Sequence, residues 1–185
     1  MGVPAFKNPL DAWILQEIVH EVRPGAIVEI GSAAGGSTLY LAHLLDLLGR
    51  GRVISVDLDR ARFQARHPRI VEVTGDSGAP ETRARVAALC EERPVMVVHD
   101  GDHRREPLLA DLESYAPLVS VGSYLIVEDG VIDLFEAGDG IGTRDQGPLF
   151  AIEEFLGRHP EFVVDEDRER YLVTYNPRGY LKRVS

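Results

Sequence analysis

The chain has 185 residues, of which 44% are hydrophobic and 27% are charged. This length predicts one globular domain over residues 1–185, large enough to fold without disulfides or a structural metal. Thirty acidic residues against twenty Lys and Arg give a formal net charge of −10 at pH 7, which disfavours nucleic acid as a partner.

Apolar segments alternate between helix-like and strand-like patterns along the chain. Asn8 and Pro9 predict the start of a first helix, in which apolar residues recur at helical spacing as far as Pro24. Buried strands are predicted at residues 26–30, 52–57, 69–73, 94–100 and 123–129, and closing strands at 161–164 and 171–175. Further helices are predicted at residues 37–48, 81–91, 105–114 and 149–156. The order predicts an α/β fold with a Rossmann-like, mostly parallel seven-stranded sheet and an antiparallel C-terminal edge.

Cysteine content and apolar run length narrow the class of protein. Cys90 is the only cysteine, which excludes a disulfide scaffold, and we expect its thiol to pack in the core. No run reaches the roughly 18 apolar residues that a membrane span requires, and the first residues contain no apolar signal core. We therefore expect a cytoplasmic protein with no membrane partner.

A glycine-rich loop follows the first buried strand, in the stretch VEIGSAAGGSTLYLA. In open parallel sheets, ligands bind beyond the carboxyl ends of the strands, where glycines let the backbone approach and a helix N-terminus faces the ligand. The pattern E-x-G-x-x-x-G-G lacks the G-x-G-x-x-G spacing that holds a dinucleotide pyrophosphate, so a cofactor without phosphate fits better. The candidate cofactor residues of this stretch are Glu29, Gly31, Ser32, Gly35, Gly36 and Ser37.

Glu29 gives the loop a preference among cofactors. Its carboxylate, expected to be ionised, would repel a pyrophosphate but suits the positively charged amino acid moiety of S-adenosylmethionine. The alternative is an ordinary tight turn that binds nothing.

Acids at two later strand ends extend the same edge of the sheet. Asp57 ends the second strand about 20 residues after the glycine loop, where an acid commonly binds ribose hydroxyls. Asp76, followed by Ser77 after the third strand, would lie beside the adenine end of a nucleoside. Any one of these residues alone is more often a turn or N-cap residue. Together with Glu29, at successive strand ends, they favour a nucleoside-binding site.

Three carboxylates converge if the fourth and fifth strands are neighbours, because Asp100 ends the fourth strand and Glu128 and Asp129 end the fifth. Uncompensated, these groups would repel one another and raise one another's pKa. A hard divalent cation relieves the repulsion, and carboxylate oxygens with room for water and substrate oxygens suit Mg²⁺. The alternative is that Asp100 and Asp129, each followed by glycine, only make turns.

His103 follows Asp100 closely enough to reach a substrate bound at such a metal. Its ordinary pKa near 6.5 lets it take a proton at neutral pH, so it is the candidate general base. A solvated loop histidine is the alternative. Asp102 is a further possible ligand or a helix cap, and His99 is expected to point into the sheet.

With these motifs in this order, the chain resembles the cephalosporin hydroxylase family over nearly its whole length. The resemblance runs from GVPAFKNPLDAWILQEI through VEIGSAAGGSTLYLA, VISVDLD, HPRIVEVTGDS, DGDH and YAPLVSVGSYLIVEDG to YNPRGYL. It implies a class I methyltransferase fold and S-adenosylmethionine-dependent O-methylation of antibiotics or natural-product sugars. It also implies that Asp100, Glu128 and Asp129 bind Mg²⁺ and that His103 is the general base. A shorter N-terminus and a longer, charged GDGIGTRDQGP segment depart from the family and bear on the acceptor.

We therefore predict a Mg²⁺-dependent O-methyltransferase that transfers the methyl group of S-adenosylmethionine to a hydroxyl of a small natural product or sugar moiety. An NAD-dependent reductase is the alternative enzyme, disfavoured by the loop spacing and by the absence of an evident Tyr-x-x-x-Lys pair. A nucleoside-binding partner subunit that has lost activity is the non-enzyme alternative.

Two further expectations concern closure of the site. We expect a homo-oligomer, because a domain this small has little of its own with which to cover a substrate. The glycine-rich segment 138–148 is predicted to be mobile in the free protein and ordered over substrate, with Arg144 touching the acceptor.

Overall fold

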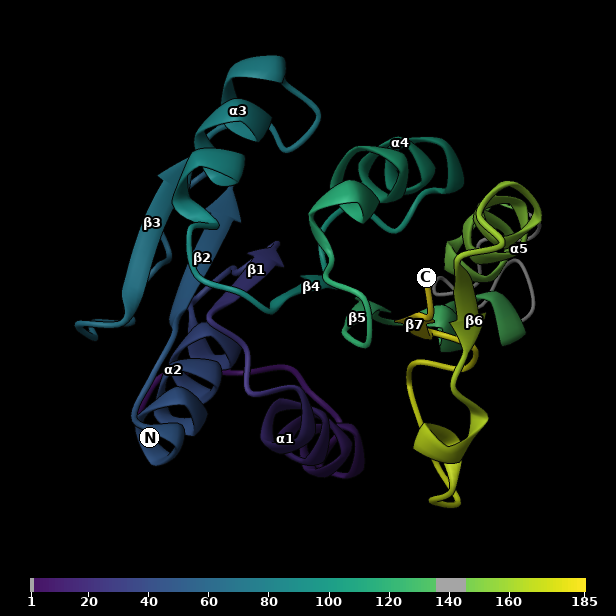
Figure 1. The fold of residues 1–185 in the computed structure, drawn as a ribbon, viewed down its shortest axis with the longest axis horizontal. Helices are drawn as coiled ribbons and strands as arrows, with labels where there is room; N and C mark the ends of the chain where they lie inside the picture. The colour runs from purple at the N-terminus through teal and green to yellow at the C-terminus, as the bar shows by residue number, and fades with distance from the viewer. Residues whose placement is uncertain (1, 136–145) are drawn as a thin grey trace.

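A computed structural model of the chain describes residues 2–135 and 146–185, in which seven strands form one sheet flanked by helices (Figure 1). The strands are β1 (Ala26–Ile30), β2 (Arg52–Asp57), β3 (Ile70–Thr74), β4 (Val95–His99), β5 (Tyr124–Val127), β6 (Phe162–Val164) and β7 (Tyr180–Arg183). Their order in the sheet is β3-β2-β1-β4-β5-β7-β6. The first five strands are mutually parallel, whereas β7 runs antiparallel to both β5 and β6. The predicted sheet, including its antiparallel C-terminal edge, is confirmed.

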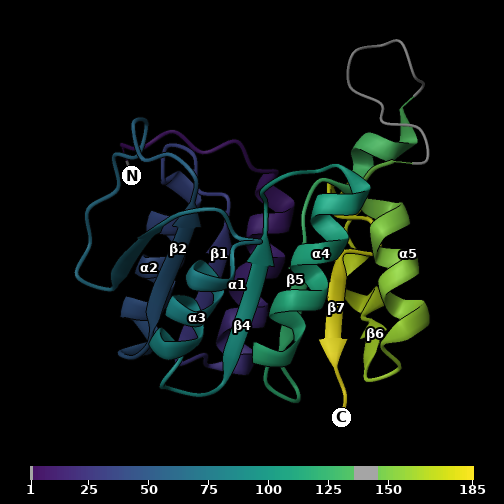
Figure 2. The same cartoon turned by 90° about the horizontal axis from the view of Figure 1, so that it is seen from above.

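Helices cover both faces of this sheet. They are α1 (Pro9–Val22), α2 (Gly36–Leu48), α3 (Pro80–Leu89), α4 (Arg105–Tyr115) and α5 (Pro148–Arg158), with short 3-10 turns η1 (Ala116–Leu118), η2 (Gly130–Leu134) and η3 (Glu166–Glu169). Figures 1 and 2 show α1 and α2 on one face and α3, α4 and α5 on the other. The predicted lid at 138–148, with Arg144, lies outside the described residues except for its last three positions.

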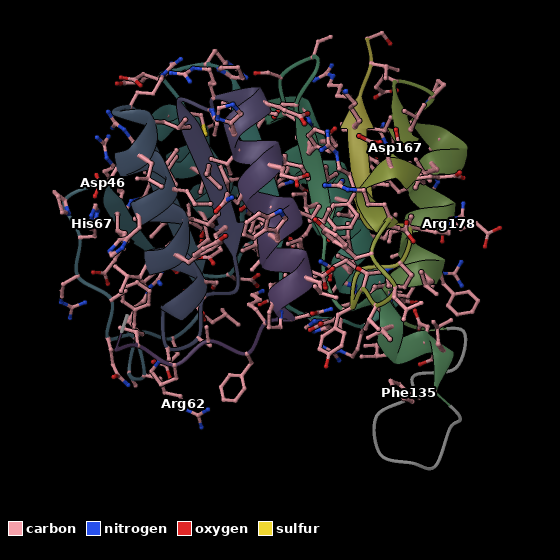
Figure 3. The ribbon with its side chains drawn as sticks, turned by 90° about the horizontal axis from the view of Figure 1, so that it is seen from below. Asp46, Arg62, His67, Phe135, Asp167 and Arg178 are labelled. Atoms are coloured by element: carbon pink, nitrogen blue, oxygen red, sulfur yellow. The ribbon has the colours of Figure 1, made fainter. Side chains whose placement is uncertain are left out.

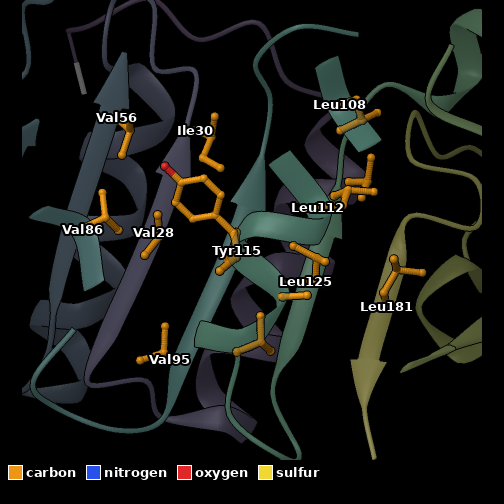
Figure 4. Close-up of a cluster of buried hydrophobic side chains, with 14 of the residues drawn as sticks. Val28, Ile30, Val56, Val86, Val95, Leu108, Leu112, Tyr115, Leu125 and Leu181 are labelled. Atoms are coloured by element: carbon orange, nitrogen blue, oxygen red, sulfur yellow. The ribbon is translucent and has the colours of Figure 1, made fainter. Parts of the chain in front are cut away.

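Local sequence accounts for the start of α1 and for the burial of the central strands. The Asn8 side chain accepts a hydrogen bond from the Leu10 N–H at 3.0 Å and so caps α1 as predicted. β1 and β4 are buried along their whole length, because helices cover both of their faces. Figure 4 shows one of the two large apolar clusters, in which Tyr115 of α4 packs over the strands. Cys90 belongs to this cluster, and burial raises the pKa of its thiol to about 11, so the expectation that it packs in the core is confirmed.

The prediction of a closing strand at residues 171–175 is wrong, because β7 lies further along the chain. Apolar and polar residues alternate in the YLVTY stretch as in a strand, but α1 and its N-cap residue bind polar groups of this stretch. Asp11 accepts hydrogen bonds from the Thr174 hydroxyl at 2.6 Å and from the Tyr175 N–H at 2.8 Å. The Asn8 side-chain amide donates to the Val173 carbonyl at 3.3 Å. Backbone groups engaged in this way cannot also join a strand ladder.

The parallel strands bring their carboxyl ends to one edge of the sheet. The strand order changes direction between β1 and β4, and ligands of open α/β sheets bind at such a point. In Figure 3, Arg62 and Phe135, which follow β2 and β5, lie at this end of the molecule. No helix among the described residues is long and apolar enough to span a membrane.

Candidate active site

The glycine loop between β1 and α2 is packed tightly on both sides. A Cβ at Gly31, where φ is +81°, would collide with the Asp100 carbonyl, and a Cβ at Gly36 would collide with the Pro4 carbonyl. Glycine is therefore required here by the close approach of backbone. Gly35 is the N-cap of α2. The loop thus contacts the residues after β4 on one side and an N-terminal segment, residues 3–8, on the other.

Asp57 at the end of β2 braces this loop. Its Oδ2 accepts hydrogen bonds from the N–H groups of Ser32 at 2.9 Å and Ala33 at 3.0 Å, and its Oδ1 accepts one from the Asp59 N–H at 3.2 Å. Partial burial acts to raise the pKa of Asp57, but these donors outweigh it and hold the pKa below its usual range. Asp57 is half-buried, so it supports the loop as well as being a candidate ribose ligand.

A cavity of about 610 Å³ opens beside the loop and reaches α4, and we call it the α4-side cavity. It brings together five of the predicted site residues, which are Gly31, Asp57, Asp76, Ser77 and Asp100. Asp76 also caps its own turn, since its Oδ1 accepts a hydrogen bond from the Gly78 N–H at 2.9 Å. Three of the predicted strand-end acids, Asp57, Asp76 and Asp100, therefore do share one cavity.

Asp111 of α4 is a lining residue that sequence reasoning missed. The Ser77 hydroxyl donates to Asp111 Oδ2 at 2.7 Å, and His99 Nε2 lies 3.0 Å from the same oxygen. His99 is buried against α4, which links the loops after β3 and β4. No motif marks Asp111, because it lies inside a helix, and only its position on the sheet-facing side of α4 could have pointed to it.

Asp100, His103 and Asp129 converge where β4 and β5 end. His103 Nε2 lies 3.0 Å from Asp129 Oδ2 and 3.6 Å from Asp100 Oδ1. One ligand atom from each of the three residues lies within 4.8 Å of the others, a spacing that could hold a metal ion. Hydrogen bonds to Asp100 and Asp129 raise the pKa of His103 to about 10, so its imidazole is protonated at pH 7 in this arrangement.

Glu128 meets the same cluster through Lys7, which sequence reasoning missed. Lys7 Nζ lies 2.6 Å from Asp100 Oδ2 and forms an ion pair with Glu128 Oε2. Burial raises the pKa of Glu128 above its usual range. Burial would lower the pKa of Lys7, but the charges of Glu128 and Asp100 outweigh it and raise that pKa. Lys7 lies far from any strand end, and its one signal is its place in the family-like stretch GVPAFKNPLDAWILQEI.

Asn176 binds the backbone of Asp129, whose side chain belongs to the cluster. Asp129 has a φ of +61°, in the left-handed region that side-chain-bearing residues rarely adopt. Its N–H donates to Asn176 Oδ1 at 3.0 Å, and the Val131 N–H donates to the Tyr175 carbonyl at 3.0 Å. Strained backbone of this kind persists where the surroundings determine it and is common at functional sites. The contact joins residues 47 positions apart, so no local pattern predicts it.

A second cavity, of about 390 Å³, lies next to α1, and we call it the α1-side cavity. Lys7, Ser37, Glu128 and Asp129 supply its charged and polar wall, and its other walls come from the N-terminal segment, α1, the start of α2, and residues 175–180. None of the described residues lines both cavities. The predicted cofactor residues are therefore divided, because Gly36 and Ser37 line this cavity, whereas Gly31, Asp57, Asp76 and Ser77 line the other.

Glu29 lines neither cavity. It is 1% exposed behind the glycine loop, where the Thr38 hydroxyl donates to its carboxylate. Burial raises its pKa to about 7, so the expectation of a fully ionised Glu29 holds only if a positive group comes near it.

The donor set fits a hard divalent cation. Asp100, Glu128 and Asp129 offer carboxylate oxygens, the ligands that Mg²⁺ prefers, and a cavity on each side leaves room for water and substrate oxygens. Asp102 does not join them, because its carboxylate accepts hydrogen bonds from the Arg104 side chain at 3.0 Å and the Arg104 N–H at 2.9 Å. The helix-cap role expected for Asp102 is wrong, because the N-cap of α4 is Arg104 without a side-chain cap hydrogen bond, and Asp102 closes the turn before that helix.

Comparisons with known proteins identify the family. Residues 1–184 match the family model of Rhamnosyl O-methyltransferase/CmcI. The chain is 34% identical over 194 residues to a rhamnosyl O-methyltransferase of Mycobacterium bovis, covering 99% of this chain and 77% of that protein. It is 32% identical over 190 residues to the enzyme of the same name from Mycobacterium leprae, covering 99% and 82%.

A solved structure described as CmcI with Mg and SAM superimposes with a TM-score of 0.75 at 24% identity, over 97% of this chain and 73% of that chain. This similarity confirms the predicted class I methyltransferase fold. Together with the family match, it confirms the resemblance to the cephalosporin hydroxylase family. The chain belongs to the Rhamnosyl O-methyltransferase/CmcI family of O-methyltransferases.

Proposed function

We propose that this chain transfers the methyl group of S-adenosylmethionine to a hydroxyl of a sugar moiety, with Mg²⁺ as its metal. One observation carries the proposal, namely that the carboxylate–histidine cluster lies between two cavities with separate walls. A methyl transfer needs a nucleoside cofactor and a hydroxyl acceptor that meet at one point. Asp100 on one cavity and Asp129 on the other, both beside His103, provide that meeting point.

The α4-side cavity suits the adenosine part of the cofactor. Asp57 and Asp76 are hydrogen-bond acceptors at successive strand ends, where ribose hydroxyls and the adenine amino group are donors. Ser37 at the N-terminus of α2 suits the carboxylate of the methionine moiety, since helix N-termini attract anions. The amino group of that moiety would favour the ionised form of the nearby Glu29.

Asp100, Glu128 and Asp129 would hold the Mg²⁺. A divalent cation bound there supplies positive charge that stabilises an acceptor oxygen as it loses its proton. The similar CmcI structure, described as holding Mg and SAM, supports the choice of Mg²⁺ as the metal and of S-adenosylmethionine as the cofactor.

His103 takes the acceptor proton at Nε2. Without a divalent cation, hydrogen bonds to Asp100 and Asp129 keep the imidazole protonated and unable to act as a base. Compensation of these carboxylates by positive charge lowers the pKa of His103 toward its ordinary value. The neutral imidazole then accepts the hydroxyl proton, while the oxygen bonds to the methyl carbon and the carbon–sulfur bond breaks.

Positioning is the larger contribution to the rate. Holding two reactants at attack distance removes roughly 7 to 11 kcal/mol of barrier. A general base adds about 10² to 10⁴ in rate, which corresponds to roughly 3 to 5 kcal/mol. The two cavities therefore matter more than His103, although His103 is the easier group to remove cleanly.

The α1-side cavity suits a sugar acceptor. Ile126, Leu15 and Tyr40 line it together with charged residues, so an acceptor with one apolar face and several hydroxyls finds complementary surroundings. Two similar relatives carry the name rhamnosyl O-methyltransferase, which makes a rhamnoside the first acceptor to test. The homo-oligomer and the cytoplasmic location stay predictions.

Calorimetric titration with S-adenosylhomocysteine and MgCl₂, against NAD as the control ligand, tests the cofactor and metal together. We expect S-adenosylhomocysteine to bind and NAD to give no heat. Release of S-adenosylhomocysteine from S-adenosylmethionine, with a methylated rhamnoside identified by mass, then tests the reaction. Tight NAD binding would favour the reductase alternative, and cofactor binding without transfer to any of a panel of glycosides would favour the inactive partner subunit.

A further inference from the structure

Lys7 lies at the candidate metal site, and the proposed reaction gives it no role. Its ammonium Nζ lies 2.6 Å from Asp100 Oδ2 and pairs with Glu128 Oε2. The Lys7 side chain is 21% exposed and that of Glu128 is 8% exposed, so the ion pair is largely shielded from water. The chain's own cation therefore binds two of the carboxylates that the proposed function assigns to the divalent cation.

The backbone on both sides of Lys7 is held in place by contacts, whereas its ammonium lies at the end of a flexible side chain. Asn8 caps α1 and also donates to the Val173 carbonyl at 3.3 Å, and the Pro4 carbonyl packs against Gly36. Lysine carries its charge on a flexible four-carbon stem. The ammonium can therefore leave the carboxylates without unfolding the N-terminal segment. Lys7 also lines the α1-side cavity, into which the displaced ammonium can turn.

We propose that Lys7 is a positioning residue of the metal site, whose ammonium holds Asp100 and Glu128 side by side until a divalent cation displaces it. The inference rests on the proposed function, because it requires that the cation binds these carboxylates. With no positive charge between them, two shielded carboxylates repel each other. With an ammonium and a divalent cation on the same oxygens, the two cations repel each other. Asp100 and Glu128 together therefore bind one cation at a time.

A different arrangement would leave Lys7 in place. Asp100 Oδ1, His103 Nε2 and Asp129 Oδ2 could hold an ion by themselves, with Glu128 still paired to Lys7. The single carboxylate of Asp100 would then carry the ion on one oxygen and the ammonium on the other, which places two positive charges close together. Displacement avoids this repulsion and adds the Glu128 carboxylate to the ligands, so it is the favoured arrangement.

The chain offers a matched control for the test, because Lys7 and Lys182 are its only lysines. Lys182 lies on β7, with its Nζ 5.6 Å from the centre of the Tyr124 ring. Mg²⁺ alone is titrated by calorimetry into the wild-type, Lys7→Met and Lys182→Met chains without cofactor. We expect Lys7→Met to bind Mg²⁺ about tenfold more tightly or better, because the competing charge is gone. Lys182→Met, which loses the same charge, should bind like the wild type.

A measurement on the wild-type chain tests the displacement of the Lys7 ammonium even if Lys7→Met does not fold. Brief acetylation followed by mass spectrometry reports how accessible each lysine is. Added Mg²⁺ should speed acetylation of Lys7 and leave that of Lys182 unchanged.

The outcomes separate this inference from the proposed function. Equal or weaker Mg²⁺ binding by Lys7→Met, or Lys7 acetylation that Mg²⁺ does not change, would overturn the displacement and leave the ion on Asp100, His103 and Asp129. Absence of Mg²⁺ binding in all three chains would overturn the metal part of the proposed function, and this inference with it.

Discussion

The two cavities lie on either side of the carboxylate–histidine cluster but are built in different ways. The α4-side cavity is lined mainly by the loops that follow β1 to β4, and most of its polar residues lie within a few positions of a strand end. The α1-side cavity joins the N-terminal segment, α1 and residues 175–180, which are held together by contacts such as that of Asp11 with the Tyr175 N–H. The first cavity depends on local structure and the second on tertiary contacts. We assign the adenosine part of the cofactor to the first and the acceptor to the second, with the methionine moiety reaching across to Ser37, and each prediction below tests that division.

Removal of the divalent cation should have the largest effect, because its proposed ligands come from both cavities, Asp100 from one and Glu128 and Asp129 from the other. A chelator should abolish methyl transfer, and added Mg²⁺ should restore it. The fold should survive, since Lys7 and His103 compensate the carboxylates without a metal. Methyl transfer and thermal unfolding, measured on the same samples, check both points. Full activity in excess chelator would remove the metal from the reaction, and unfolding would indicate a structural ion.

The same division explains how much of the site could be predicted from the sequence. Asp57, Asp76 and Asp100 follow apolar runs that read as strands, and parallel strands bring such positions to one edge, so their shared cavity was predictable. Lys7 pairs with carboxylates 93 and 121 positions away in the sequence, and Asn176 binds a residue 47 positions away. No period or motif encodes contacts of that range.

The fold shows the same limit at its C-terminal edge. The antiparallel edge is correct, but the last strand was assigned to YLVTY, whose alternating pattern is typical of a strand. Tertiary hydrogen bonds, accepted by Asp11 and donated by Asn8, override that local preference, and Leu172 is almost fully exposed. The buried central strands were therefore predictable from the sequence. The position of the last strand was not, because Asn8 and Asp11 bind residues 171–175 as an extended segment outside the sheet.

His103→Ala should give the next largest effect. The rate should fall by about 10² to 10⁴ with cofactor and Mg²⁺ affinities nearly unchanged, because only the proton acceptor is lost. His67→Ala is the control, since His67 also pairs with a carboxylate, that of Asp46, but outside both cavities.

The pH profile of the rate gives His103 a second readout. His103 is charged below its pKa and becomes a base as the pH rises through it, so the wild-type rate should increase with pH. This increase should be absent in His103→Ala. A near-normal rate in that variant would leave positioning alone to explain the transfer.

Asp57→Ala should affect the cofactor side only. It removes the brace on the Ser32 and Ala33 N–H groups together with a candidate ribose ligand. S-adenosylhomocysteine should bind about tenfold to hundredfold more weakly, the range expected for lost hydrogen bonds to a charged group. Asp57→Asn keeps an acceptor for the loop, and a smaller loss in that variant would separate the brace from the charge. Calorimetric affinity identical to that of the wild type would take Asp57 out of the site.

Ala12→Trp should affect the acceptor side only. Ala12 lines the α1-side cavity from α1, so a larger side chain occupies space that the acceptor needs. KM for the acceptor should rise about tenfold while the affinity for S-adenosylhomocysteine stays the same. His20→Trp, at an exposed position of the same helix, is the control. Weaker cofactor binding in Ala12→Trp would contradict the division between the cavities.

Asn176→Ala should have the smallest effect, and it tests how the acceptor side supports the metal. The substitution removes the acceptor of the Asp129 N–H while Asp129 keeps an unfavourable positive φ. One hydrogen bond contributes about 0.5 to 1.5 kcal/mol, so Mg²⁺ affinity should fall about twofold to tenfold as Asp129 relaxes away from His103. Asn176→Asp keeps the accepting oxygen and should retain more of the affinity. The affinity for S-adenosylhomocysteine without metal should not change, because Asn176 lies on the other cavity. If Asn176→Ala weakened cofactor binding as much as Mg²⁺ binding, residues 175–180 would belong to both sites and the separation of the two cavities would fail.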